Sequence, residues 1–224
     1  TKWAYQIRRA EDIAWAVSRA FYIASSGRPG PVVLDIAKDA QVNSCEYSYE
    51  KTISLRSYRP LPTPNKDNII AAAKLINEAE KPFALIGQGV VLGEAEKELV
   101  DFLEKAQIPF ASTILGLSAV PSDHALNCGM LGMHGNVAPN IKTNECDVLI
   151  AIGMRFDDRV TGDLNTYAKQ AKVIHFDIDR AEIDKNVKTT VKVLGDVKRT
   201  LPMVTELMNE NSHVQWVESF KKYD

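Results

Sequence analysis

The sequence has few cysteines, no long apolar run and no excess of charge of either sign. Its three cysteines, Cys45, Cys128 and Cys146, follow no pattern, which argues against a disulfide framework or a zinc site and favours a reducing compartment. No apolar run approaches the roughly 20 residues that span a bilayer. The net charge of −2 indicates neither nucleic acid nor an anionic membrane as a partner.

Several motifs that carry chemistry are also missing. The sequence contains no phosphate-binding G-x-x-x-x-G-K-[ST] loop, no H-E-x-x-H zinc motif and no Cys-x-x-Cys pair. No serine or cysteine is placed to form a triad with His134, which we interpret as structural rather than catalytic. We therefore predict no catalytic residue and no metal ligand within this chain.

Strand and helix patterns alternate from residue 65 onward. Strands are predicted at 83–86, 108–112, 147–152, 172–177 and 191–194. Helices are predicted at 69–76, 99–106, 137–144, 180–186 and 197–208. Such alternation predicts the α/β class, with a doubly wound, mostly parallel sheet of about six strands flanked by helices.

The composition divides the chain into four segments: 1–42, a Pro-rich linker at 43–64, a domain at 65–206, and a connecting segment at 207–224. Within the first segment, residues 11–25 have helical spacing and 31–36 form an apolar strand pattern, which is too little for a domain. The chain begins at Thr1 without a methionine, so we expect it to be part of a longer protein.

Glycines and an aspartate follow the predicted strands. Gly87-x-Gly89 stands where open α/β sheets bind nucleotides, although a simple turn is an equally good interpretation. Asp177 ends a strand and lies 24 residues after Gly153, where dinucleotide folds place the acid that binds a ribose hydroxyl. Capping of a helix near Ala181 is the alternative, for which Asp179 is better placed.

Two further stretches have an unusual composition. Residues 153–162, GMRFDDRVTG, combine a glycine with arginines that can bind phosphate and carboxylates that can accept from hydroxyls. Asp157 and Asp158 point in different directions on any regular element, so ion pairing or ligand contact is favoured over acid–base chemistry. In residues 129–135, GMLGMHG, three glycines let the backbone approach a flat ligand on which the methionines can pack.

The motifs GRPGPV (27–32), GMLGMHG (129–135), RFDDRVTG (155–162), HFDID (175–179) and GDV (195–197) occur in one order. In this combination the sequence resembles the large catalytic subunit of acetolactate synthase, a thiamine-diphosphate enzyme, over nearly its whole length. The resemblance implies that 1–42 is the end of a pyrimidine-binding domain, 65–206 a central FAD-binding domain, and 207–224 the start of the linker to a diphosphate-binding domain.

The resemblance also implies a set of FAD contacts. By position these are Arg59, Gly87, Gly89, Thr113, Ile114, Leu115, Leu131, Gly132, Met133, His134, Gly153, Arg155, Asp157, Arg159, Val160, Asp177, Ile178, Glu182, Gly195, Asp196 and Val197.

Such an enzyme condenses two pyruvates, or pyruvate with 2-oxobutyrate, and releases CO₂ in branched-chain amino-acid synthesis (isoleucine, valine and leucine). Thiamine diphosphate and Mg²⁺ carry the reaction, and FAD has no net redox role. The family's catalytic glutamate precedes the region matched by Thr1, and its Gly-Asp-Gly motif follows Asp224, so we expect this chain alone to be inactive. The resemblance further implies a cytoplasmic homodimer, with a small regulatory subunit as a possible partner.

Two alternatives remain open. The parent could be another FAD-containing thiamine enzyme, such as glyoxylate carboligase or pyruvate oxidase, although residues 155–162 disfavour this. The chain could also be a non-catalytic nucleotide-binding module.

Overall fold

The computed structural model describes residues 1–223 and divides the chain into two compact units. The first unit runs from Thr1 to Leu61 and the second begins at Pro62. Each unit has a hydrophobic core of its own. Within the described residues, no helix is both long enough and apolar enough to cross a membrane.

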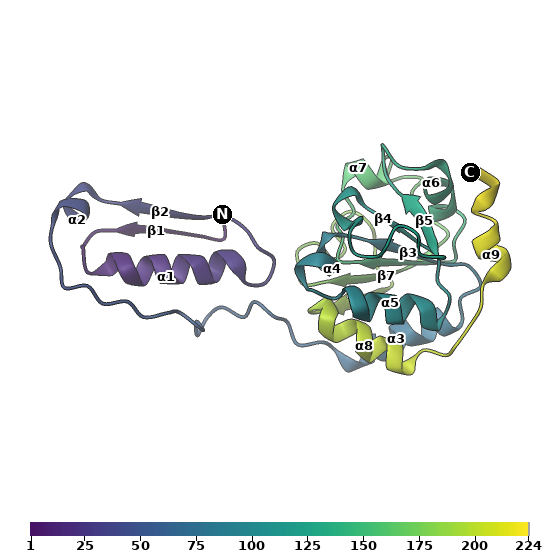
Figure 1. The fold of residues 1–224 in the computed structure, drawn as a ribbon, viewed down its shortest axis with the longest axis horizontal. Helices are drawn as coiled ribbons and strands as arrows, with labels where there is room; N and C mark the ends of the chain where they lie inside the picture. The colour runs from purple at the N-terminus through teal and green to yellow at the C-terminus, as the bar shows by residue number, and fades with distance from the viewer. Residues whose placement is uncertain (224) are drawn as a thin grey trace. The chain divides into compact units, whose positions relative to one another are not determined.

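The first unit is a small β–α–β arrangement (Figure 1). Its elements are β1 (Trp3–Ile7), α1 (Asp12–Ser25), β2 (Val32–Ile36) and α2 (Lys38–Val42). The two strands pair in parallel, with Trp3 opposite Val32. Ile7, Ala16 and Ala40 form the buried core. The sequence-based prediction of a helix–strand pair was incomplete here because it missed β1.

The second unit contains a six-stranded sheet in which every strand is parallel to its neighbours. The strands are β3 (Pro82–Ile86), β4 (Phe110–Ser112), β5 (Asn127–Met130), β6 (Val148–Ile152), β7 (Lys172–Asp177) and β8 (Val191–Leu194). Their order is β5-β4-β3-β6-β7-β8, so the chain runs outward first from β3 and then from β6. The predicted fold class is thereby confirmed, and the order is that of dinucleotide-binding folds.

Helices cover both faces of this sheet (Figure 1). The helical elements are α3 (Lys66–Asn77), α4 (Gln88–Leu92), α5 (Glu96–Lys105), η1 (Ile114–Gly116), α6 (Val137–Thr143), α7 (Asp158–Thr161), α8 (Val197–Leu207), α9 (Val214–Glu218) and η2 (Lys221–Tyr223). Ile150 and Ile152 of β6 pack toward α3, α5 and α8, whereas Leu149 and Ala151 pack toward α6 and α9. Because both faces are buried, the central strands are continuously apolar.

Two sequence-based assignments in this unit need correction. β5 was missed because Asn127–Met130 has no apolar run and is only half-buried at the edge of the sheet. The helix predicted at 180–186 is a series of turns instead. Asp179 accepts from the Ala181 amide at 2.9 Å, and Asp184 has a positive φ of 60° and accepts from Thr189. These local bonds replace the helical ones.

Candidate functional site

The carboxyl ends of all six parallel strands lie on the same side of the sheet. Many of the residues predicted for the site directly follow these strand ends. Gly87 follows β3, Thr113 follows β4, and Leu131 follows β5. Gly153 follows β6, Ile178 follows β7, and Gly195 follows β8. β3 and β6 are neighbours whose connections lead to opposite sides, so a crevice is expected between their carboxyl ends.

Three glycines pack against one another at this point of reversal. The Gly89 amide donates to the Gly153 carbonyl at 2.8 Å, and the Gly87 amide donates to Ile152 at 2.9 Å. A Cβ on Gly89 would lie 2.7 Å from the Gly153 Cα, and Gly153 has a φ of +59°. Close packing of two loops is therefore sufficient to explain these glycines, with or without a bound nucleotide.

The loop after β6 presents charged groups. Arg155 Nε lies 3.1 Å from Asp157 Oδ2, and the Arg155 side chain remains 55% exposed. Asp157 Oδ1 is buried and has no hydrogen-bond partner among the described residues. The Arg159 side chain is exposed as well. The predicted ion pairing of Asp157 is thus present, and the loop retains an acceptor and two guanidinium groups for a ligand.

The loop after β5 lies against the Arg159 segment. The Met133 amide donates to the Arg159 carbonyl at 2.8 Å, and Arg159 Nη1 is 4.0 Å from the Met133 sulfur. Leu131 is buried, whereas Met133 is 58% exposed and His134 is also exposed. Half-buried Val160 follows in α7. Met133 and Arg159, which are 26 positions apart in sequence, therefore form one surface.

Two asparagines hold the loop after β5 in place, and neither belongs to the predicted site residues. Asn140 accepts from the Gly132 amide at 2.9 Å and donates to the Gly132 carbonyl at 3.0 Å. Asn136 Oδ1 accepts from the Met130 amide at 2.8 Å. Asn136 and Asn140 both follow the GMLGMHG stretch. Their closeness to it in sequence is the only signal that could have indicated that they hold this loop.

Asp177, the last residue of β7, makes a local hydrogen bond. Its Oδ1 accepts from the Asp179 amide at 2.7 Å, and its Oδ2 lies 3.6 Å from His175 Nε2. Glu182, predicted nearby, is mostly buried and pairs with Lys185 at 3.1 Å. Asp177 thus supports a turn, and Asp179 accepts from the Ala181 amide within a series of turns, so the helix that the alternative interpretation expected it to cap is absent.

The remaining predicted residues divide into apolar and structural groups. Ile114 and Leu115, which follow β4, are 71% and 60% exposed and so present apolar surface to solvent. Asp196 is the N-cap of α8 and accepts from the Lys198 amide at 3.0 Å, while Val197 is buried. Arg59 belongs to the first unit, and its role remains a prediction.

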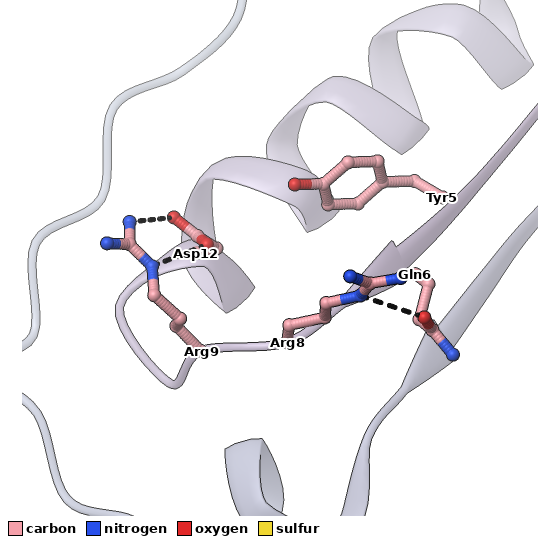
Figure 2. A pocket seen from close by; sticks show the side chains of 5 residues that line it. All are labelled: Tyr5, Gln6, Arg8, Arg9 and Asp12. Carbon is pink, nitrogen blue, oxygen red and sulfur yellow. Dashed lines mark hydrogen bonds and ion pairs between the residues drawn. The ribbon is translucent and has the colours of Figure 1, made fainter.

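The first unit has a depression of its own at the carboxyl end of β1 (Figure 2). Tyr5, Gln6, Arg8, Arg9 and Asp12 line it. Arg9 pairs with Asp12 at 2.9 Å, which raises the pKa of the guanidinium and lowers that of the carboxyl, and Arg8 donates to Gln6 at 3.0 Å. Arg9 and Asp12 therefore satisfy each other, and Arg8 is bonded to a neutral amide.

Comparison with known proteins gives one family and a consistent set of relatives. Residues 69–204 match the family model described as thiamine pyrophosphate enzyme, central domain. An acetolactate synthase of Mycobacterium leprae is 47% identical over 201 residues, covering 90% of this chain and 32% of that protein. A probable acetolactate synthase large subunit of Methanocaldococcus jannaschii is 45% identical over 204 residues, covering 90% of this chain and 34% of its own length.

A more distant relative covers almost the whole chain. The acetolactate synthase isozyme 3 large subunit of Escherichia coli is 35% identical over 224 residues, covering 99% of this chain and 39% of that protein. The chain therefore spans about a third of the length of the curated relatives it matches.

Proposed function

Because the chain belongs to the family of thiamine pyrophosphate enzyme central domains, we propose that it is the FAD-binding central domain of an acetolactate synthase. The observation that carries this proposal is the convergence of all six strand ends on one edge, with the dinucleotide-type strand order. The names of the relatives support acetolactate synthase over other FAD-containing thiamine enzymes.

The chemistry of this edge fits FAD. The buried, unpartnered oxygen of Asp157 can accept from a ligand hydroxyl, and the exposed guanidinium groups of Arg155 and Arg159 suit a pyrophosphate. Exposed Ile114 and Met133 offer apolar surface to a ring system. Asp177 Oδ2 is the proposed acceptor for the adenosine ribose.

The remaining FAD contacts are proposed to come from backbone and neighbouring side chains. They are Gly87, Gly89, Thr113, Leu115, Leu131, Gly132, His134, Gly153, Val160, Ile178, Glu182, Gly195, Asp196 and Val197. FAD would supply no net redox chemistry in this role.

The parent protein is proposed to condense two pyruvates, or pyruvate with 2-oxobutyrate, with release of CO₂. Thiamine diphosphate and Mg²⁺ would perform that reaction in a cytoplasmic homodimer, which could also bind a small regulatory subunit. We expect the purified chain, given pyruvate, thiamine diphosphate and Mg²⁺, to form no acetolactate, because none of its residues matches the family's thiamine-activating glutamate. Acetolactate above the protein-free background, in a colorimetric assay, would contradict this.

Flavin binding tests the proposed function directly. The chain is titrated with FAD and FMN while flavin fluorescence is followed, with bovine serum albumin as a nonspecific control. We expect saturable FAD binding that is weaker for FMN, because FMN lacks the adenosine proposed to contact Asp177. Equal binding of both would remove the adenosine assignment, and no saturable FAD binding would contradict the proposed function.

A further inference from the structure

We propose that His175 is a positioning residue of the FAD site, which acts by holding the Met154 carbonyl. His175 lies in β7, the strand that ends at Asp177, whereas Met154 lies in the charged loop after β6. The inference rests on the proposed function, because it explains how the phosphate-binding loop keeps its position.

The imidazole of His175 is fully buried, and its hydrogen-bond partners determine which ring nitrogen carries the proton. Its Nε2 lies 2.8 Å from the Met154 carbonyl oxygen, which can only accept, so Nε2 carries the proton. Within residues 1–223, Nδ1 has no hydrogen-bond partner. A proton on Nδ1 would be a buried donor without an acceptor, so the hydrogen bonds favour the Nε2–H tautomer.

The ring has little freedom to move. Phe156 packs against it at an interplanar angle of 69°, with 5.1 Å between the ring centroids. Tyr167 packs against Phe156 in turn, at 6.1 Å. The donor therefore has a fixed position beneath the loop, as a positioning group requires.

Met154 lies in close contact with the glycine loop at the point where the strand order reverses. A Cβ on Gly87 would lie 2.6 Å from the Met154 Cα, so the two backbones are already in close contact. Gly153, one residue earlier, accepts from the Gly89 amide at 2.8 Å. Arg155 follows directly. A displacement of the carbonyl would therefore move the proposed phosphate-binding arginine relative to the glycine loop.

Because the Nε2 proton of His175 is bonded to Met154, Asp177 Oδ2 stays available to a ligand. Asp177 Oδ2 lies 3.6 Å from His175 Nε2, farther than the Met154 oxygen, so the single N–H is directed to the carbonyl. Asp177 Oδ1 is occupied by the Asp179 amide. His175 thus lies between the proposed phosphate loop and the proposed ribose acid, and its bond to Met154 leaves Asp177 Oδ2 without a donor from the ring.

The test compares two substitutions of His175 in the full chain. His175→Gln keeps an N–H donor of similar reach, whereas His175→Leu keeps the apolar volume and removes the donor. We expect the leucine variant to bind FAD about tenfold more weakly and the glutamine variant to remain within about threefold of the unmodified chain. His124→Leu is the matched control, because His124 precedes β5 and lies at the amino end of that strand, away from the carboxyl ends that form the proposed site. This substitution should leave FAD affinity within about twofold of the unmodified chain.

The outcomes separate the two proposals. No FAD binding by the unmodified chain would overturn the proposed function itself. Binding by the unmodified chain with equal affinity in His175→Leu, or equal loss in the glutamine and leucine variants, would overturn the positioning role.

A measurement on the unmodified chain keeps the inference testable if the leucine variant does not fold. With four histidines in the chain, ¹⁵N resonances can be assigned by substitution. We expect His175 to be the Nε2–H tautomer with and without FAD, and an Nδ1–H tautomer would overturn the inference.

Discussion

Arg155 keeps a largely exposed guanidinium despite its ion pair with Asp157, so it can engage an anion without first being released from the protein interior. We expect Arg155→Ala to weaken FAD binding by about 1.5–3 kcal/mol, the value of a hydrogen bond to a charged group. Isothermal titration calorimetry measures this, with Lys74→Ala on α3 as a control that removes an exposed cation elsewhere. Unchanged affinity in both Arg155→Ala and Arg159→Ala would exclude the phosphate role.

Asp177 has two separable roles, one for each carboxylate oxygen. Asp177→Ala should lower both FAD affinity and flavin-free thermal stability, because the Asp179 amide also loses its acceptor. Asp177→Asn retains a carbonyl oxygen and should lose affinity only modestly.

Asp179→Ala provides the matched control, since it removes the turn bond to Ala181 and leaves the Asp177 carboxylate in place. Its melting temperature should fall while FAD affinity is unchanged. Loss of stability with intact affinity in Asp177→Ala would make Asp177 a purely structural residue.

The residues of this site differ in how far the sequence can predict them. Asp177 and Arg155 follow apolar strands, and strand ends in a parallel sheet lie together, so their proximity could be predicted. His175 could not be selected in the same way, because a histidine within an apolar strand does not reveal which carbonyl it meets. That contact depends on β6 and β7 being neighbours.

At the scale of elements, the segment containing α9 docks on the sheet face opposite α5. Trp216 Nε1 donates to the Pro82 carbonyl at 2.8 Å, and the Phe220 ring lies 5.1 Å from that of Phe83. Lys142 Nζ lies 5.0 Å from the centroid of the Trp216 ring. The indole of Trp216, the phenyl ring of Phe220 and the ammonium group of Lys142 therefore hold this short helix against the sheet.

His213 makes this docking sensitive to pH. Burial lowers the pKa of His213, against the smaller opposing effects of a Glu80 backbone hydrogen bond and Asp147. The undocked histidine therefore takes up a proton more readily than the docked one. Its contribution is fully present above the ordinary pKa of about 6.5 and decreases as the pH falls below it.

We expect acidification below about pH 6.5 to expose Trp216 and to shift its fluorescence to the red. The other two tryptophans, Trp3 and Trp15, lie in the first unit. His213→Phe should remove most of this shift. Trp3→Phe and Trp15→Phe in the background isolate the Trp216 signal. The same pH dependence in the His213→Phe variant would assign the effect to other groups.

The elements themselves were predicted unevenly, for physical reasons. β6 and β7 are buried on both faces and are mostly apolar, so their sequences identify them. β1 has an alternating pattern over only five residues and needs Val32–Ile36 as a partner, which local sequence does not specify. At 180–186, side chains of Asp179 and Asp184 satisfy backbone amides that a helix would otherwise use.

For the whole molecule, the two units differ greatly in the size of their cores. The first has Ile7, Ala16 and Ala40 as its fully buried apolar residues, whereas the second has an extensive core on each face of its sheet. Since stability depends on buried apolar area, the first unit should unfold at the lower temperature.

Calorimetry should therefore record two thermal transitions. FAD at about a hundred times its dissociation constant adds about 2.7 kcal/mol to the state that binds it, which corresponds to about 5–10 °C for a unit of this size. We expect only the upper transition to move, because the predicted contacts other than Arg59 all lie in the second unit. Asp177→Ala should reduce the shift at the same FAD concentration. A single transition that moves as a whole would mean that the units unfold together, and a shift of the lower one would place the flavin contacts in the first unit.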